Sequence, residues 1–433
     1  MTHARVALAK NSKIATVNWS EFVWFYEEVG NMAVNLHAPD TLLPIAGVRL
    51  ASVNAGIRYK NRNDLLLIEL EQGSHTAAVF TRNAFCAAPV HVCRANLLHS
   101  NARYLLINAG NANAGTGEPG MAAARESCEQ VAELGECWAE QVLPFSTGVI
   151  GQQLPVEKIT AALPEVFAKL DADAWMEASR TIMTTDTIAK AISRQVEIFG
   201  ETVTITGIAK GAGMIHPNMA TMLAYVATDA LVEKETLQTL LNEVVEETFN
   251  CITVDGDTST NDSLIVMATG SSGVYVGGDG LPAFRAALLD VCLYLAQAIV
   301  RDGEGATKFI SIDVQGAATR AEARIVGNTV ALSPLVKTAL FASDPNWGRI
   351  LAAVGRSHVD ALDVSRISIW LGETLLIENG EPAPTYREEL GAAETKREEI
   401  DIRIHLGRGE ASATTWTCDF SYDYVKINAE YRS

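Results

Sequence analysis

The sequence predicts a layered α/β or α+β fold built around a large hydrophobic core. Strand patterns and amphipathic helix patterns are mixed along the chain, and 48% of its 433 residues are hydrophobic while 20% are charged. Disordered chains have the opposite composition, with few hydrophobic residues and a high charge. The length predicts two or three domains or one large α/β body, and mixed strands and helices pack as layers around a shared core.

Short apolar runs bounded by turn residues predict the strands. They lie at 64–70, 77–81, 104–108, 222–227, 264–268 and 309–314, with hairpins through 196–208 and after Arg366 and Glu399.

Two segments have helical spacing, and one charged segment lacks it. Residues 232–249 bring several apolar side chains onto one stripe, and residues 123–134 end at Gly135, which predicts a left-handed cap. The charge-rich segment 387–399 is predicted to be a solvated loop.

Charge and cysteine usage exclude several classes of protein. The net charge is −18, from 34 Lys and Arg against 52 Asp and Glu, and such a field repels phosphate backbones and anionic lipid surfaces. We therefore expect neither nucleic acid nor a membrane as a partner. The seven cysteines are odd in number and form no C-x-x-C pair, which argues against a disulfide framework and a zinc ribbon. We expect reduced thiols in a cytoplasmic protein without a metal ion.

Two further segments bear on targeting and membrane association. The apolar stretch 281–300 contains Arg285 and Asp290, charges that a lipid-facing span rarely accepts. Residues 1–31 contain no uninterrupted apolar region of the kind a secretory signal needs. We expect them to be an extension outside the fold, with translation starting at Met1 or at Met32.

Two motifs suggest other functions. Residues 115–120 fit G-x-G-x-x-G after a strand, but the intervening loop and Pro119 favour a close-packed glycine and asparagine loop over a dinucleotide site. Asp255 and Asp257 follow a strand as in haloacid-dehalogenase phosphotransferases, where two carboxylates act beside Mg²⁺. A phosphotransferase using these aspartates therefore stays an alternative, as does a non-enzymatic acidic binding protein.

The segment 210–223 combines glycines, Pro217 and a threonine, Thr221, at the start of a strand. Glycines allow close approach to a ligand and proline stiffens the chain. Taken alone, Thr221 is an ordinary strand residue or a nucleophile, and His216 an ordinary loop histidine.

Seven ordered segments together resemble the ornithine acetyltransferase family, the glutamate N-acetyltransferases of arginine biosynthesis. They are PFSTGVIG (144–151), MTTDT (183–187), KGAGMIHPNMATML (210–223), DGDTSTND (255–262), RDGEGATK (301–308), SDPNWGR (343–349) and NAEYRS (428–433). The resemblance extends from Met32 to Ser433, and the segment before Met32 departs from the family pattern.

The resemblance implies a chain that cleaves itself between Ala220 and Thr221, giving an α chain (32–220) and a β chain (221–433). Thr221 would then supply both the nucleophilic hydroxyl and, through its free α-amine, the base; such an amine has a pKa of about 7.7–8.0, near working pH. The family moves acetyl from N2-acetylornithine to glutamate through an acetyl-threonine ester. Some members also use acetyl-CoA as the donor.

The resemblance also implies the remaining site residues. Thr147 and Gly148 would form the oxyanion hole, and the loop 255–262 would support the site. No metal or organic cofactor is implied, and we expect an α2β2 assembly and a sandwich of sheets between helices like that of self-processing aminopeptidases. The implied substrate contacts are Thr187, Lys210, Thr221, Glu304, Asn428 and Ser433.

Overall fold

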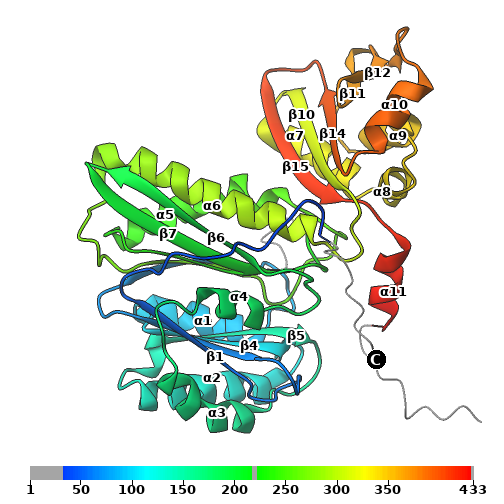
Figure 1. Ribbon diagram of the computed structural model, residues 1–433. Coiled ribbons are helices and arrows are strands. Elements are labelled where there is room, and N and C mark those ends of the chain that lie inside the picture. Colours follow the sequence, from blue (N-terminus) through cyan, green and yellow to red (C-terminus); the bar gives the residue numbers. More distant parts are fainter. Residues whose placement is uncertain (1–32, 217–221, 431–433) are drawn as a thin grey trace, which may run out of the picture. The chain divides into compact units, whose positions relative to one another are not determined.

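The chain forms three β-sheets, each covered by helices, in a computed structural model that describes residues 33–216 and 222–430 (Figure 1). The first sheet has the order β1-β2-β4-β5, and only its β4–β5 pair is parallel. The second has the order β3-β9-β8-β7-β6, and only β8–β9 is parallel. Their strands are β1 Val48–Val53, β2 Leu65–Leu70, β4 Tyr104–Asn111, β5 Val142–Val149, β3 His75–Phe80, β9 Ser263–Ala268, β8 Leu223–Thr228, β7 Glu201–Lys210 and β6 Lys190–Ile198.

These two sheets pack face to face between layers of helices. One buried cluster joins Leu66 and Ile107 of the first sheet to Tyr225 and Met267 of the second. The outer face of the first sheet packs against α2 (Gly117–Leu134) and α3 (Val156–Ala168), and that of the second packs against α5 (Lys234–Glu247) and α6 (Leu281–Arg301). Two further helices complete this part of the fold: α1 (Ala88–His99) packs against β5 and α2, and α4 (Trp175–Thr181) contacts strands of both sheets. The predicted layered α/β class is confirmed.

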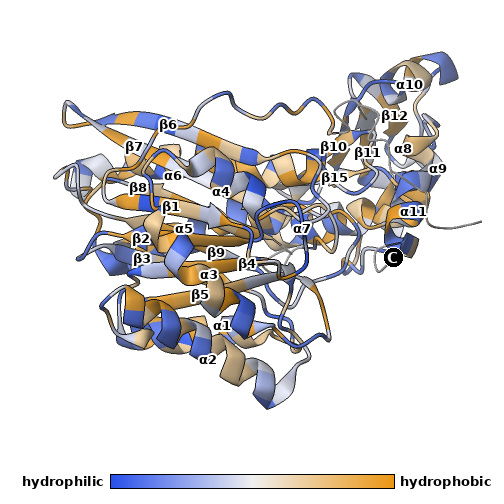
Figure 2. Ribbon diagram, turned by 60° about the horizontal axis from the view of Figure 1, so that its bottom comes forward, coloured by the Kyte–Doolittle hydropathy of each residue, from blue (hydrophilic) through white to orange (hydrophobic). Residues whose placement is uncertain are grey.

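Apolar residues follow this layering. Figure 2 shows hydrophobic residues concentrated along the strands of the stacked sheets, while the helices carry both hydrophobic and hydrophilic residues. Strand β4 is buried along its whole length, so both of its faces need apolar side chains or backbone contacts.

The third sheet corrects one predicted pairing. Its order is β13-β12-β11-β14-β10-β15, so β14 and β15 do not form the hairpin expected after Glu399; both pair with β10 instead. The hairpin after Arg366 is confirmed as β11–β12. Helices α7, α8 and α9 share a core with this sheet. The elements are β10 Phe309–Ala317, β11 Ser368–Leu371, β12 Thr374–Glu378, β13 Glu381–Pro382, β14 Glu399–His405, β15 Ala411–Cys418, α7 Arg320–Ala331, α8 Pro334–Phe341, α9 Trp347–Gly355, α10 Glu388–Thr395 and α11 Tyr422–Glu430.

Two local expectations are wrong. Helix α10 occupies most of the segment 387–399 that was predicted to be a loop; it lies against β11 and β12, and its Gly391 and Thr395 are buried. Helix α2 does end before Gly135, but Gly135 has φ −86°, and the left-handed residue is Glu136 with φ +49°.

Helix α6 lies within the most apolar stretch of the sequence. Among the described helices, only Gly278–Arg301 is long and apolar enough to cross a membrane, and half of that window is buried inside the protein. Phe284, Leu288 and Val291 are fully buried, and the helix packs against β6 and β7. It is therefore a core helix of the sandwich.

Candidate active site

A cavity of about 260 Å³ lies where the carboxyl ends of β4, β5 and β7 meet the segment before β9. Four of the residues expected from the sequence line it, namely Gly148, Lys210, Glu304 and Asn428. They come from four segments far apart in the chain, and they meet because β7 and β9 flank β8 in one sheet while β5 lies in the sheet packed beneath. Its other lining residues are Ala112, Val149, Ile150, Thr184, Thr185, Gly213, Met214, Ser259, Thr260 and Asn261.

A carboxylate and an amide face each other in this cavity. Glu304 is 7% exposed, and its Oε2 accepts a hydrogen bond of 2.8 Å from Asn428 Nδ2. Gly213 leaves the room that the carboxylate needs, since a Cβ at this position would lie 2.4 Å from the Glu304 carboxyl carbon. Helix α11 thus brings Asn428 into the wall of the cavity.

Lys210 supplies the positive charge of the cavity. It ends β7, pairs with Leu223 in the adjacent strand and is 6% exposed. Burial lowers the pKa of its ammonium, and the nearby carboxylates of Asp186 and Glu304 oppose this effect. None of the described residues accepts a hydrogen bond from its Nζ, so the ammonium is suited to pair with the carboxylate of a ligand.

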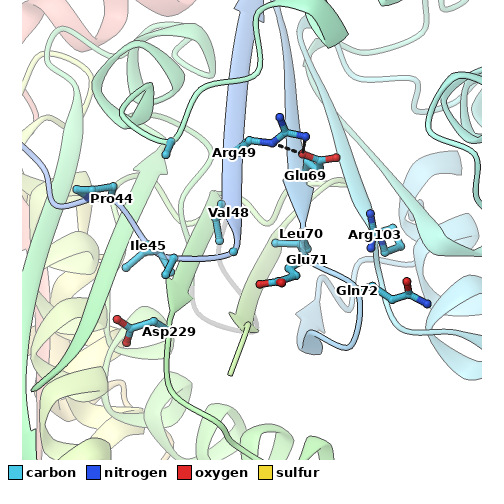
Figure 3. Close-up of a pocket in the computed structure, with 13 residues that line it drawn as sticks. Pro44, Ile45, Val48, Arg49, Glu69, Leu70, Glu71, Gln72, Arg103 and Asp229 are labelled. Atoms are coloured by element: carbon cyan, nitrogen blue, oxygen red, sulfur yellow. Dashed lines mark hydrogen bonds and ion pairs between the residues drawn. The ribbon is translucent and has the colours of Figure 1, made fainter. Parts of the chain in front are cut away.

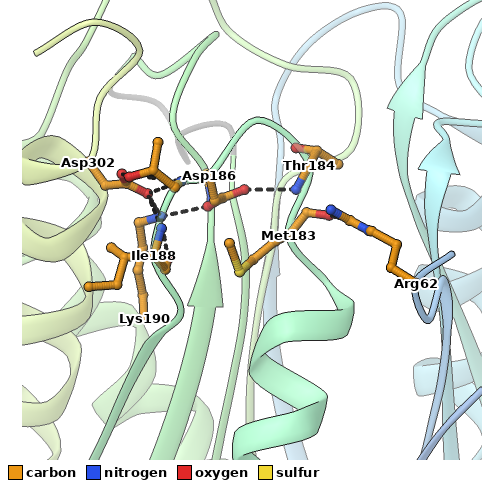
Figure 4. Close-up of polar contacts among 9 residues, drawn as sticks. Arg62, Met183, Thr184, Asp186, Ile188, Lys190 and Asp302 are labelled. Carbon is orange, nitrogen blue, oxygen red and sulfur yellow. Dashed lines mark hydrogen bonds and ion pairs between the residues drawn. The ribbon is translucent and has the colours of Figure 1, made fainter. Parts of the chain in front are cut away.

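A buried ion triad supports the loop beside Lys210 (Figure 4). Lys190 Nζ lies 2.6 Å from Asp186 Oδ1 and 2.5 Å from Asp302 Oδ2, and all three side chains are at most 1% exposed. Burial opposes ionisation of Asp186, but Lys190 and Lys210 outweigh it and hold its pKa below the ordinary value. Asp186 also accepts the amides of Gly211 (2.6 Å) and Thr184 (2.9 Å), so this carboxylate fixes two walls of the cavity.

The structure places Thr187 differently from the other expected contacts. Its side chain is exposed and is not among the residues that line the cavity. Its hydroxyl donates to Asp302, and its amide lies 3.0 Å from Asp302 Oδ2. In this structure Thr187 therefore belongs to the surroundings of the triad.

Thr147 and Gly148 end β5 beside the cavity. Thr147 is 8% exposed, and Gly148 has φ +132°, a conformation that favours glycine. A Cβ on Gly148 would lie 2.2 Å from the Gly110 carbonyl carbon. Only glycine at position 148 therefore allows β4 and β5 to approach each other this closely. Asn261 Nδ2 fixes this corner by donating to the carbonyls of Ser146 (2.9 Å) and Ala112 (2.7 Å). Sequence reasoning assigned the loop of Asn261 a supporting role but missed this contact.

Asp255 anchors the chain that leads toward residue 217. It accepts the amides of Met214 (2.5 Å) and Ile215 (3.0 Å), and Met214 is held at φ +58°. Such a left-handed residue costs about 1–3 kcal/mol and persists only where its surroundings fix it. Burial raises the pKa of Asp255 to about 6. Both of its oxygens are thus used to hold backbone, which fits a supporting role better than phosphotransfer.

Three expected residues cannot be placed. Ala220, Thr221 and Ser433 lie outside the described residues.

A second and larger cavity, about 750 Å³, lies where β1 begins and β2 ends (Figure 3). Its charged side chains are largely paired: Arg49 lies 2.5 Å from Glu69, and Glu71 accepts a hydrogen bond of 2.8 Å from Ser271. None of the residues expected from the sequence lines it.

The smaller cavity brings backbone and hydroxyl donors, a buried ammonium and a carboxylate around one small space, an arrangement that suits acyl transfer. A sequence profile of the ArgJ family matches residues 49–433, and the chain belongs to this family. The resemblance to the ornithine acetyltransferases is thereby confirmed, and the chain is an acyltransferase of arginine biosynthesis.

Several known proteins are similar to this chain. The "arginine biosynthesis bifunctional protein ArgJ" of Methylococcus capsulatus is 57% identical over 395 residues, which cover 90% of this chain and 97% of the relative. A crystal structure of the Mycobacterium tuberculosis ornithine acetyltransferase complexed with ornithine is 35% identical, with a TM-score of 0.35, over 40% of this chain and 92% of that one. The Ochrobactrum anthropi l-aminopeptidase d-ala-esterase/amidase, a variant of the Ntn-hydrolase fold, matches at 13% identity and a TM-score of 0.38, over 60% of this chain and 85% of that one.

Proposed function

We propose that this acyltransferase cleaves its own Ala220–Thr221 bond and then moves acetyl from N2-acetylornithine to glutamate. One observation carries the proposal: Gly148, Lys210, Glu304 and Asn428 meet in one cavity beside the start of β8, the strand that begins two residues after Thr221. The residues of chain 1–220 and those of chain 221–433 contribute to the same site, so a cut at residue 220 leaves it assembled.

In the proposed cleavage, the Thr221 hydroxyl attacks the carbonyl carbon of Ala220. The C–O bond forms, the C–N bond breaks, the hydroxyl proton ends on the released amine, and water hydrolyses the ester. The anchored turn at Met214 and Ile215 holds the chain that enters this segment.

In the proposed transfer, the free α-amine of Thr221 takes the hydroxyl proton as the hydroxyl attacks the acetyl carbonyl of the donor. The C–N bond of the donor breaks, and ornithine leaves with that proton. The amine of glutamate then attacks the acetyl-threonine ester, the ester C–O bond breaks, and a proton of the glutamate amine returns to the Thr221 oxygen. Thr147 and the Gly148 amide would stabilise the tetrahedral oxyanion of both steps.

The charges of the cavity suit both substrates. Lys210 would pair with the α-carboxylate that the donor and glutamate share, and Glu304, held by Asn428, would meet the side-chain ammonium of the donor. These are charge-assisted contacts that place the acyl group for attack. We further propose a cytoplasmic α2β2 assembly, and acetyl-CoA is a second donor to be tested against acetylornithine in steady-state assays.

The activity is tested by incubating the purified protein with N2-acetylornithine and isotopically labelled glutamate. Labelled N-acetylglutamate and free ornithine in equal amounts are expected. Hydrolysis of the donor to acetate, without transfer to glutamate, would refute the proposed acceptor.

Thr147→Ala should slow transfer by about 10²–10³-fold, because removing one oxyanion donor typically costs about 2.7–4 kcal/mol of barrier. The preference between donors should stay unchanged, since Thr147 acts on the carbonyl that all donors share. The measurement is kcat/KM for two donors, with Thr239→Ala as control; Thr239 is exposed on α5 and bonds its own helix at Glu235. An equal rate in Thr147→Ala and the control would exclude the hydroxyl from the oxyanion hole.

Gly213→Ala should raise the KM for N2-acetylornithine by about 10–100-fold. The new Cβ meets the Glu304 carboxyl group at 2.4 Å and would displace it from Asn428, and a hydrogen bond to a charged group is worth about 1.5–3 kcal/mol. Gly355→Ala on α9 is the matched control, because its Cβ meets nothing within 4 Å. An unchanged KM in Gly213→Ala would mean that Glu304 does not take part in binding the donor.

A further inference from the structure

A buried amide on β4 has an oxygen without a partner. Asn108 is 3% exposed, and in the strand register it lies opposite Ser146 of β5. Its Nδ2 donates to Ser146 Oγ at 2.6 Å and to the Phe145 carbonyl at 3.4 Å. Because a carbonyl oxygen can only accept, the Phe145 contact identifies this atom as the amide nitrogen. The amide oxygen, Oδ1, is buried and has no hydrogen-bond partner among the described residues, which calls for an explanation.

A small internal cavity lies beside this amide. Its volume is about 10 Å³, and Asn108 and Ser146 line it together with Ser127 of α2. Every residue that lines it is buried, so the cavity belongs to the interior between the first sheet and α2. One water molecule needs about 10–15 Å³ of such space and two to four polar partners. The cavity therefore has the size for a single water molecule.

The polar groups at this cavity complement a water molecule. Asn108 Oδ1 is an acceptor without a donor. Ser146 Oγ accepts from Asn108, and none of the described residues accepts its own proton. Ser127 Oγ donates to the Ala123 carbonyl at 2.8 Å, which leaves its lone pairs available. A water molecule would donate to Asn108 Oδ1 and Ser127 Oγ and accept the Ser146 proton, and all three side chains would then be satisfied.

Ser146 connects this cavity to the candidate active site. It directly precedes Thr147 and Gly148, and its carbonyl accepts a hydrogen bond of 2.9 Å from Asn261 Nδ2. Successive side chains of a strand point to opposite faces. The Ser146 side chain therefore lies on the face that meets α2, and the Thr147 side chain lies on the other face. Asn108 holds the hydroxyl of Ser146 and Asn261 holds its carbonyl, so this residue is fixed at both groups.

We infer that Asn108, together with one internal water molecule in this cavity, is a positioning residue for acyl transfer. The amide and the water hold the Ser146 hydroxyl, and Ser146 in turn sets the place of the Thr147 hydroxyl and the Gly148 amide. This inference rests on the proposed function, in which those two groups stabilise the oxyanion. Asn108 does not line the cavity of the candidate active site, so it acts through Ser146 and touches no substrate.

The kinetic test compares Asn108→Ala with the wild type, both cleaved and soluble. Without the amide, Ser146 loses its partner and the oxyanion donors move, so kcat per folded enzyme should fall by about tenfold or more. The KM for N2-acetylornithine should stay within about twofold, because Lys210 and Glu304 are untouched. Ser146→Ala removes only the hydroxyl and provides the same readout if Asn108→Ala does not fold.

Asn96→Ala is the matched control. Asn96 Nδ2 donates to the Val142 carbonyl at 2.8 Å, so this amide holds the opposite end of β5. Its variant should keep the wild-type kcat per folded enzyme, even if the unfolding midpoint in urea falls. A double variant adds a readout that a purely structural role would not move. Because Asn108 acts through the oxyanion donors, adding Asn108→Ala to Thr147→Ala should lower kcat by only about threefold or less.

A crystal structure of the cleaved enzyme tests the water directly. One ordered water within hydrogen-bond distance of Asn108 Oδ1 and Ser146 Oγ is expected, and an empty cavity would overturn the water site. Suppose that Thr147→Ala slows transfer as expected, but Asn108→Ala and Ser146→Ala keep the kcat of Asn96→Ala. The positioning role is then wrong, while the proposed function stands. If Thr147→Ala itself does not slow transfer, both the proposed oxyanion hole and this inference fail.

Discussion

Thr221→Ala should yield one intact chain of 433 residues and no measurable acetyl transfer. The change removes the hydroxyl that would attack the Ala220 carbonyl and form the acetyl ester. Without cleavage, the α-nitrogen of residue 221 stays in a peptide bond and cannot act as a base. Loss of a covalent nucleophile typically lowers kcat by about 10⁴-fold or more. Intact-mass measurement reads the processing, and the labelled-glutamate assay reads the transfer.

Thr221→Ser is the matched control for this experiment. It keeps a hydroxyl and, once cleaved, an α-amine on the same residue, so both cleavage and transfer should persist at reduced rates. Turnover of Thr221→Ala within tenfold of the wild type would mean that acetyl passes directly between the substrates, and the covalent route would have to be abandoned.

Lys190→Met should destabilise the protein by about 3–5 kcal/mol, because it leaves two buried carboxylates without their shared cation. The side chains of Asp186 and Asp302 are at most 1% exposed, and Lys190 contacts both. Folded domains are stable by only about 5–15 kcal/mol, so much of the variant should be insoluble or unfolded at growth temperature. The unfolding midpoint in urea measures the loss.

Lys169→Met is the control for the triad. Lys169 forms an ion pair of 2.7 Å with Glu165, but both side chains are more than half exposed, and such pairs contribute about 0–1 kcal/mol. Similar midpoints for the two lysine variants would mean that the buried triad does not stabilise the fold. A loss of transfer in soluble Lys190→Met would in addition reflect movement of Thr184 and Gly211, which Asp186 holds.

Local patterns in the sequence were sufficient to predict most strands and helix α5. The run 104–108 and the stripe that includes Leu237 and Val244 depend on neighbours within one element, and the structure places β4 and α5 there. The pairing of β10 with β14 and β15 was not predictable in this way, because these strands lie 82 or more residues from β10 in the sequence. They pair through backbone N–H and C=O groups, which every residue except proline carries, so the sequence holds no local signal for the pairing.

The same distinction applies to the site. The family segments pointed to Gly148, Lys210, Glu304 and Asn428, which the structure brings together. The contacts that hold them were invisible in the sequence. Lys190 and Asp302 are 112 residues apart, and Asn261 reaches Ala112 across 149 residues. The packing of α6 on β6 makes the first two residues neighbours, and the stacking of the two sheets does so for the second two.

The most direct test of the account is the mass of the active enzyme, quenched in acid during turnover with N2-acetylornithine alone. The account expects two chains, the second beginning at Thr221, with one acetyl group added to a fraction of the second chain and located by peptide mapping on its first residue. A full-length chain in the active preparation, or acetyl found on any residue other than Thr221, would contradict it.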